Sequence, residues 1–252
     1  MPDSVLVDVQ DGVGIITLNR PEAKNALNLD VATRVADAVD RFEADDSIVA
    51  MVLTGAGGTF CSGMDLKAFT RGERPSIPGR GLCGITEQSP DKPLIAAVEG
   101  YALAGGCEMA LACDIIVAAR TAKFGIPEVR RGLVAAAGGV LKLAKTMPYG
   151  AAMELALTGD FIDAQRAHEL GIVTRVAEDG EAMSDALALA KRIAKNAPLA
   201  VKASKQLVAG SVKWTDKDLL AWQAKLLAPV MTSADAIEGA TAFAEKREPA
   251  WK

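Results

Sequence analysis

The sequence holds a single histidine, His168, among its 252 residues. With one imidazole, few of the usual zinc ligands are available, and a Ser-His-Asp or Cys-His nucleophile has only one possible base. His168 lies in the polar stretch DAQRAHELG, which is typical of a solvated helix, and no GxSxG motif accompanies it. Chemistry in this protein is therefore expected to rest on carboxylates or on backbone groups.

Metal-binding and nucleotide-binding motifs are also missing. The four cysteines show no CxxC spacing, so we expect reduced thiols and no metal site. The glycine-rich stretch at 55–63 lacks the third glycine of the dinucleotide fingerprint, because Phe60 stands there, and Met64 replaces the lysine of a phosphate-binding loop. These absences predict a protein that uses no metal, nicotinamide or flavin.

Long hydrophobic runs and an excess of positive charge are absent as well. The most apolar stretches, at 101–113 and 132–144, are interrupted by Gly, Glu or Lys and are too short to cross a bilayer. The N-terminal residues lack the features of a signal or transit peptide, so we expect a cytoplasmic protein without a membrane partner. The net charge of -4 and pI near 5.2 predict no nucleic-acid partner.

Apolar patterning predicts an α/β fold. Two apolar runs at 5–9 and 13–18 flank an Asp-Gly pair that suits a tight hairpin turn, and an amphipathic helix is expected over 28–44. Short continuous apolar runs at 48–53, 94–98 and 115–119 are typical of strands buried on both faces. Since helices or long loops separate them, the sheet is expected to be mostly parallel.

The second part of the sequence is mainly helical in pattern. A Gly- and Pro-rich loop is expected at 70–92, where it could shape a pocket. Beyond residue 148, one strand is predicted at 172–176, and Thr215 with Asp218 resembles a capping box. Helices are predicted at roughly 180–196, 198–209, 215–228 and 234–246.

Two glycine-rich segments are candidates for an oxyanion site. In the segment 99–115, the pattern predicts a strand that ends in glycines and a helix that begins near Gly105 or Gly106, where backbone amides lack partners. Glu108 falls in the first turn among apolar neighbours, although an acidic residue favouring a helix N-terminus is the simpler interpretation. The segment 57–69 repeats the pattern and could supply a second donor.

A second candidate carboxylate is Glu128, which follows Pro127 in the segment 124–139. Two arginines come soon after it, so the simpler interpretation is a salt bridge to Arg130 or Arg131.

Together these segments resemble the crotonase, or enoyl-CoA hydratase, superfamily over nearly the whole chain. The matching stretches occur in family order: RPEAKNALN at 20–28, TFCSGMDLKAF at 59–69, PLIAAVEGYALAGGCEMALACDI at 93–115, FGIPEVRRGL at 124–133, TGDFIDAQRAHELGIVTRV at 158–176 and EGATAFAEKREP at 238–249.

The resemblance implies a spiral of ββα units over residues 1–194 and a helical oligomerisation region over 195–252, assembled as a homotrimer or homohexamer. It places the oxyanion hole at the backbone amides of Met64 and Gly105, and the catalytic pair at Glu108 and Glu128. It implies coenzyme A contacts at Lys24, Ala26, Leu27, Asp65, Leu66 and Lys67, and a contribution from a neighbouring subunit at Phe243 and Lys246.

The implied activity is the addition of water to a trans-2-enoyl-CoA, with coenzyme A entering only as part of the acyl-CoA substrate. Glu108 would mainly activate water, and Glu128 would mainly exchange a proton at the α-carbon. An enoyl-CoA isomerase, a carnitinyl-CoA-type dehydratase or a non-catalytic binding protein of the same fold remain alternatives. Two departures, the loop at 70–92 and GLVAAAGG at 132–139, concern the acyl pocket.

Overall fold

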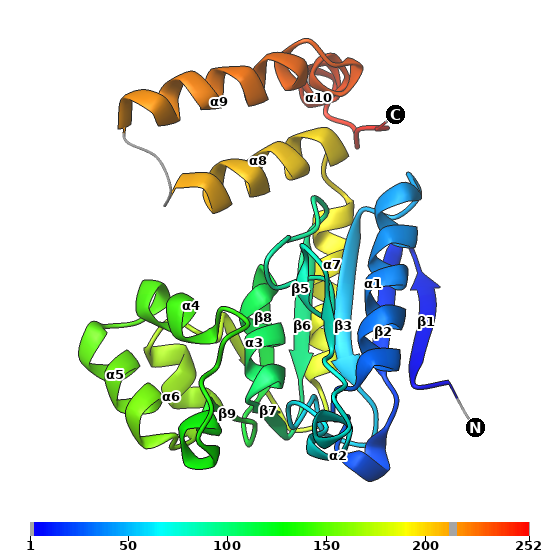
Figure 1. Ribbon diagram of the computed structural model, residues 1–252. Helices are drawn as coiled ribbons and strands as arrows, with labels where there is room; N and C mark the ends of the chain where they lie inside the picture. The colour runs from blue at the N-terminus through cyan, green and yellow to red at the C-terminus, as the bar shows by residue number, and fades with distance from the viewer. Residues whose placement is uncertain (1–2, 212–215, 252) are drawn as a thin grey trace.

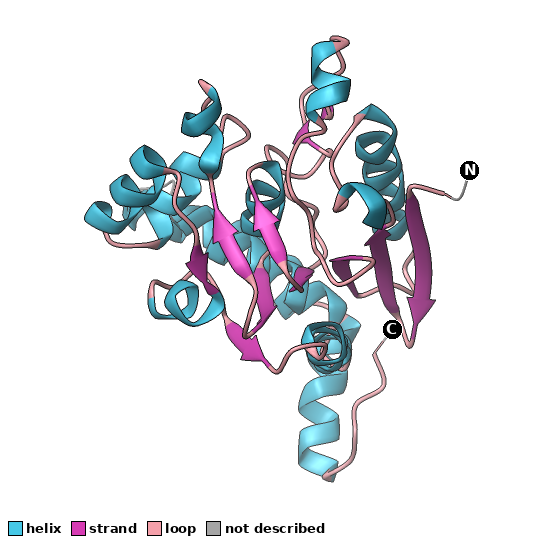
Figure 2. Cartoon of the chain, turned by 90° about the horizontal axis from the view of Figure 1, so that it is seen from below, coloured by secondary structure: helices cyan, strands magenta, loops and turns pink. Residues whose placement is uncertain are grey.

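Figure 1 shows the chain as a computed structural model that describes residues 3–211 and 216–251. Its centre is a six-stranded sheet in the order β1-β2-β3-β6-β8-β11, parallel except for the first strand. Seen from below, helices lie on both sides of the strands (Figure 2). The strands are β1 Val5–Gln10, β2 Val13–Leu18, β3 Ala50–Gly55, β6 Leu94–Val98, β8 Ile115–Ala119 and β11 Arg175–Ala177.

The chain opens with the expected hairpin. β1 and β2 pair antiparallel, and Asp11 and Gly12 turn between them with φ values of 50° and 76°. Positive φ at both central residues matches the twist that a two-residue hairpin needs. The following helix, α1 Leu29–Ala44, is capped by Asn28, whose side chain accepts a hydrogen bond from the Val31 amide.

The parallel strands are buried on both faces, which explains their continuous apolar sequences. Along β3, Met51 and Leu53 join one hydrophobic cluster, while Ala50 and Val52 join a second cluster on the other face. Helix α7, Ala182–Ala194, packs on the second face, against β3, β6 and β8. The larger first cluster extends toward the elements that carry the site.

Those elements form a second layer beside the main sheet. A three-stranded sheet in the order β10-β9-β7 supports helix α3, Gly105–Ala112, which directly follows β7. Short helices complete the layer: α2 Leu66–Thr70, α4 Gly139–Thr146, α5 Tyr149–Thr158, α6 Ala164–Glu169, and the 3-10 turns η1 Pro21–Ala23 and η2 Pro127–Arg131. The strands of this layer are β7 Tyr101–Leu103, β9 Lys123–Gly125 and β10 Ile162–Asp163.

Two of the predicted strand boundaries are wrong for the same reason. Ile48 belongs to a turn that closes the preceding helix, since its amide donates to the Asp45 carbonyl. The amides of Ile172 and Val173 donate to the Ala167 carbonyl at the end of α6, so pairing with β8 begins only at Arg175. Apolar residues that close a helix end have the same sequence pattern as a strand.

The predicted loop at 70–92 is largely irregular but contains a small hairpin, β4 Ser76–Ile77 with β5 Gly81–Leu82. A two-residue strand is too short to leave a periodic pattern in the sequence. This hairpin positions the wall of the cavity described below.

The C-terminal helices lie above the α/β part of the molecule in Figure 1. They are α8 Pro198–Ser211, α9 Asp216–Met231 and α10 Ala234–Glu245, and the predicted cap at Thr215 lies outside the described residues. Helix α8 is tied to the core by Lys205, whose Nζ lies 2.6 Å from the Asp114 carboxylate and 2.9 Å from the Lys92 carbonyl oxygen. None of the described helices has the length and apolar character needed to span a membrane.

Candidate active site

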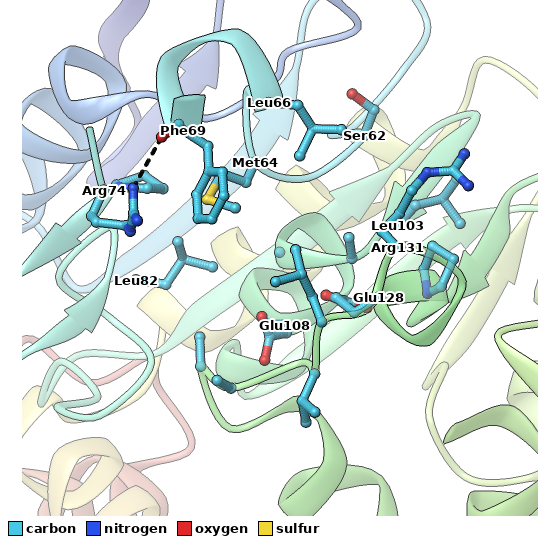
Figure 3. Close-up of a pocket in the computed structure, with 18 of the residues that line it drawn as sticks. Ser62, Met64, Leu66, Phe69, Arg74, Leu82, Leu103, Glu108, Glu128 and Arg131 are labelled. Carbon is cyan, nitrogen blue, oxygen red and sulfur yellow. Dashed lines mark hydrogen bonds between the residues drawn. The ribbon is translucent and has the colours of Figure 1, made fainter. Parts of the chain in front are cut away.

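A cavity of about 630 Å³ lies where three segments of the second layer meet. One wall comes from residues 62–76, another from 103–108 and a third from 127–137. Its lining is mainly apolar, yet Figure 3 shows the carboxyl groups of Glu108 and Glu128 at the same cavity. These three segments are the ones that the sequence singled out for chemistry.

Close backbone packing brings the two glycine-rich segments together at the cavity. Gly63 has a φ of +101°, and a Cβ atom there would lie 2.6 Å from the Cβ of Ala104. Ala104 itself has a φ of 51° and is held by a hydrogen bond from its amide to the Gly125 carbonyl. Only glycine at position 63 permits this approach without displacement.

This close approach places the backbone amides of Met64 and Gly105 on neighbouring segments of the chain. Both residues line the cavity, and within the described residues neither amide donates a hydrogen bond. Gly105 is the first residue of α3, where the amide has no intrahelical acceptor and the helix dipole favours negative charge. The pair therefore has the donor character that an oxyanion hole requires.

Glu108 lies in the first turn of α3, and its side chain is buried, with 4% of the residue exposed. Its Oε1 accepts a hydrogen bond of 2.9 Å from the Gly139 amide at the start of α4. Burial, with a smaller contribution from the nearby charge of Glu128, raises the pKa of Glu108 to about 7 against the lowering effect of that hydrogen bond. A carboxyl poised near neutrality can both take and return a proton.

Glu128 lies on η2 and forms no salt bridge with any residue that the structure describes, so the simpler interpretation, a salt bridge to Arg130 or Arg131, is wrong. Arg130 instead binds Asp160 and the Thr158 carbonyl, and Arg131 donates to the Arg130 carbonyl. The Oε2 atom of Glu128 is buried and is the one buried side-chain oxygen or nitrogen without a partner among the described residues. Burial raises the pKa of this carboxyl as well.

An unpartnered buried carboxyl oxygen costs free energy, commonly on the order of 1 to 3 kcal/mol, unless a ligand or a proton transfer uses it. Within the described residues, no group of three or more His, Cys, Asp or Glu side chains is placed to hold a metal ion. The arrangement is suited to proton transfer beside a stabilised oxyanion.

Some of the residues predicted to contact coenzyme A line the cavity or pack behind its wall, and others lie away from it. Leu66 is 50% exposed and lines the cavity. Leu27 is fully buried, and its backbone pairs with the 63–65 strand through the Gly63 carbonyl and the Asp65 amide. Ala26 and Asp65 are joined by Arg20, which donates to the Ala26 carbonyl at 2.6 Å and to the Asp65 carboxylate at 3.0 Å.

The remaining predicted contacts lie away from the cavity lining. Lys24 is exposed, with its Nζ 5.3 Å from the centre of the Tyr101 ring, and Lys67 is exposed on α2. Lys246 is exposed just after α10, and the side chain of Phe243 lies outside the described structure. Figure 1 places α10 at the opposite end of the molecule from α2, so Lys246 does not reach the cavity of its own chain.

Sequence reasoning missed the groups that hold Glu108. A Cβ atom at Gly139 would lie 2.8 Å from the Cγ of Glu108, so the glycine allows the carboxyl to reach the amide. The signal was present, because Gly138 caps and Gly139 begins an amphipathic helix. Arg74 and Phe161 also line the cavity, and no local pattern marked them.

A family model described as enoyl-CoA hydratase/isomerase matches residues 8–252. The chain belongs to this family. Among other relatives of the family, enoyl-CoA hydratase EchA19 from Mycobacterium tuberculosis is 40% identical over 255 residues, covering 98% of this chain and 96% of the relative. The carnitinyl-CoA dehydratase of Escherichia coli K12 is 42% identical over 246 residues, covering 94% of each chain.

Solved structures of the enoyl-CoA hydratase/isomerase family share the fold closely, so the chain has the crotonase-like architecture. An enoyl-CoA hydratase from Mycobacterium tuberculosis H37Rv superposes with a TM-score of 0.97 at 57% identity, covering 99% of both chains. EchA1 from Mycobacterium marinum gives a TM-score of 0.97 at 58% identity, covering 99% of this chain and 98% of that one.

Proposed function

We propose that the protein catalyses the reversible addition of water to a trans-2-enoyl-CoA. The observation that carries the proposal is the meeting of two carboxyls of raised pKa with two free backbone amides at one cavity. Hydration of an α,β-unsaturated thioester requires a base for water, an acid for the α-carbon and donors for the oxygen between them. The relatives are named as enzymes that act on CoA thioesters, and this supports the same chemistry.

In the proposed reaction, Glu108 accepts a proton from water while the water oxygen forms a bond to the β-carbon. The double-bond electrons move toward the thioester carbonyl, whose oxygen gains negative charge. The amides of Met64 and Gly105 donate hydrogen bonds to that oxygen. Glu128 then gives its proton to the α-carbon, and the reverse sequence removes water.

Coenzyme A enters as part of the substrate, and no other cofactor takes part. Leu66 would contact the substrate directly. The buried Leu27 and the Arg20 bridge between Ala26 and Asp65 would hold the Met64 amide in place. The exposed Lys24 and Lys67 are placed to attract the phosphates of coenzyme A, and Phe243 and Lys246 would serve the cavity of a neighbouring subunit.

The first test replaces each carboxyl by its neutral amide. Glu108→Gln and Glu128→Gln should each lower kcat for trans-2-butenoyl-CoA by about a hundredfold or more, because each removes a proton-transfer group. Glu154→Gln, which changes an exposed carboxyl on α5, should leave kcat unchanged and is the matched control. Circular dichroism would check that all three variants keep the fold.

The proposed mechanism is wrong if both active-site variants hydrate at the wild-type rate. If Glu108→Gln loses hydration but still moves a double bond between the 3 and 2 positions of an enoyl-CoA, the isomerase alternative gains support. The 42% identity to carnitinyl-CoA dehydratase makes carnitinyl-CoA a second substrate to test in the direction of water removal.

A further inference from the structure

One wall of the cavity carries an arginine that the proposed reaction does not use. Arg74 follows α2 in the loop before the small hairpin, and its guanidinium carbon lies 4.0 Å from the centre of the Phe69 ring. Figure 3 shows both residues at the cavity, across from the two glutamates, with Leu82 nearby. Arg74 is exposed and lines the cavity together with apolar residues such as Phe69 and Leu82.

The hydrogen bonds of Arg74 fix its orientation and leave donors free. Its Nη1 donates to the Phe69 carbonyl at 3.2 Å and to the Glu73 carbonyl at 2.8 Å. Within the described residues, Nε and Nη2 make no hydrogen bond and no carboxylate forms an ion pair with the side chain. This free edge is the fork that binds a carboxylate through two parallel hydrogen bonds.

We infer that the acyl pocket takes enoyl groups that end in a carboxylate, and that the Nε and Nη2 edge of Arg74 binds this terminal group. The inference rests on the proposed function and adds the substrate class to it. Stacking on Phe69 and the two carbonyl contacts hold the guanidinium in place before the ligand arrives, which lowers the entropy lost on binding.

Two other charged residues of the cavity wall offer competing assignments. Glu87 would suit a cationic acyl group, but its carboxylate accepts no hydrogen bond from another described residue that would hold it in place. Arg131 donates only to the Arg130 carbonyl and lies beside Glu128 and Leu103 in Figure 3, on the side away from Phe69. Each of these residues is therefore varied in the test.

The test compares two substrates of equal chain length, trans-2-hexenedioyl-CoA and the neutral trans-2-hexenoyl-CoA. We expect the wild type to prefer the diacid derivative by about tenfold or more in kcat/KM, through a lower KM, since a charge-assisted pair is worth this much. Arg74→Met should remove the preference, by raising the KM for trans-2-hexenedioyl-CoA more than the KM for trans-2-hexenoyl-CoA. Arg71→Met, which removes an arginine paired with Glu73 outside the cavity, is the matched control and should keep the preference.

A binding measurement separates the inference from the proposed function. Calorimetry would compare adipyl-CoA with hexanoyl-CoA, which are saturated and cannot be hydrated. Adipyl-CoA should bind about tenfold more tightly to the wild type, with an advantage that shrinks in high salt, and equally to Arg74→Met.

Equal binding of the two saturated ligands by the wild type would overturn the inference while leaving hydration intact. Loss of the preference in Arg131→Met rather than Arg74→Met would overturn the assignment of the residue. If the wild type instead prefers an acyl group that ends in trimethylammonium, and Glu87→Gln removes that preference, the carboxylate assignment is overturned. If the wild type hydrates neither trans-2-hexenedioyl-CoA nor trans-2-hexenoyl-CoA, the result contradicts the proposed function instead.

Discussion

At the residue scale, the two glutamates are distinguished by their partners. Glu108 accepts a hydrogen bond from Gly139, while Glu128 keeps a buried oxygen without a partner. Two nearby carboxyls titrate as a pair, because ionisation of one raises the pKa of the other. The hydrogen bond from Gly139 favours the ionised form of Glu108, while burial favours the protonated form of both carboxyls.

The raised pKa of Glu108 predicts how hydration depends on pH. Glu108 must be ionised to accept a proton from water, and its pKa is raised to about 7, so kcat/KM should fall as the pH drops below about 7. Water removal uses the protonated carboxyl and should fall as the pH rises through the same range. Stopped assays in both directions over pH 5 to 9 would check this.

A wild-type hydration profile that stays flat down to about pH 5 would mean that Glu108 keeps an ordinary carboxyl pKa. Residual activity of Glu108→Gln should lack the acidic limb, which makes this variant the control for the assignment.

At the element scale, the site depends on how closely two backbone segments approach. Gly63→Ala would place a methyl group 2.6 Å from the Ala104 Cβ and strain a backbone with φ of +101°. We expect the segments to separate and kcat to fall by at least about tenfold, since loss of a whole oxyanion donor costs roughly a hundred- to a thousandfold.

Gly72→Ala is the matched control for this prediction. Its φ of +86° imposes similar backbone strain, but no atom lies within 4 Å of the added Cβ position. It should lower the unfolding temperature without lowering kcat. If Gly63→Ala and Gly72→Ala have the same kcat, the close approach has no role in catalysis.

Local patterns predicted most elements because the residues that make them are neighbours in the sequence. The Asp11-Gly12 turn and the buried apolar strands are of this kind. A local pattern can mark a helix start at Gly139, but it does not show that Glu108 meets Gly139 or that Gly63 meets Ala104, because each contact joins separate segments of the chain. The pairing of the two glutamates came from the family resemblance, and Arg74 was not found because a charged residue in a loop is ordinarily solvated.

At the scale of the whole molecule, the C-terminal helices leave apolar side chains uncovered. Val208, Met231 and Ile237 are each exposed by 67% or more, and Trp222, Leu226, Leu227 and Val230 are partly exposed. The side chains of Leu219 and Leu220 lie outside the described structure. We propose that residues 195–252 form an oligomerisation region.

Sedimentation at micromolar concentration should therefore show a trimer or a hexamer. Closed symmetry would bring residues such as Lys246 to a neighbouring cavity, so assembly and activity should be lost together. Val208→Glu combined with Ile237→Glu should weaken assembly, whereas Leu6→Glu on the outer strand β1 should not. A fully active monomer would contradict both the assembly and its role in the site.

The proposed chemistry uses only side chains, backbone amides and the thioester substrate. Dialysis of the protein against a strong chelator should leave kcat unchanged. If activity is lost and zinc or magnesium restores it, a metal ion takes part in the reaction and the proposed mechanism is wrong.

All four cysteines, Cys61, Cys83, Cys107 and Cys113, are buried and unpaired, and burial raises the pKa of Cys61 and of Cys107 to about 12. At neutral pH these thiols hold almost no thiolate, which is the form that maleimides and peroxide attack. The native cysteines thus present no reactive thiol, and a single cysteine introduced on an exposed helix would take a fluorophore at one position. Such a labelled protein would report the exchange of subunits by energy transfer without removal of any native thiol.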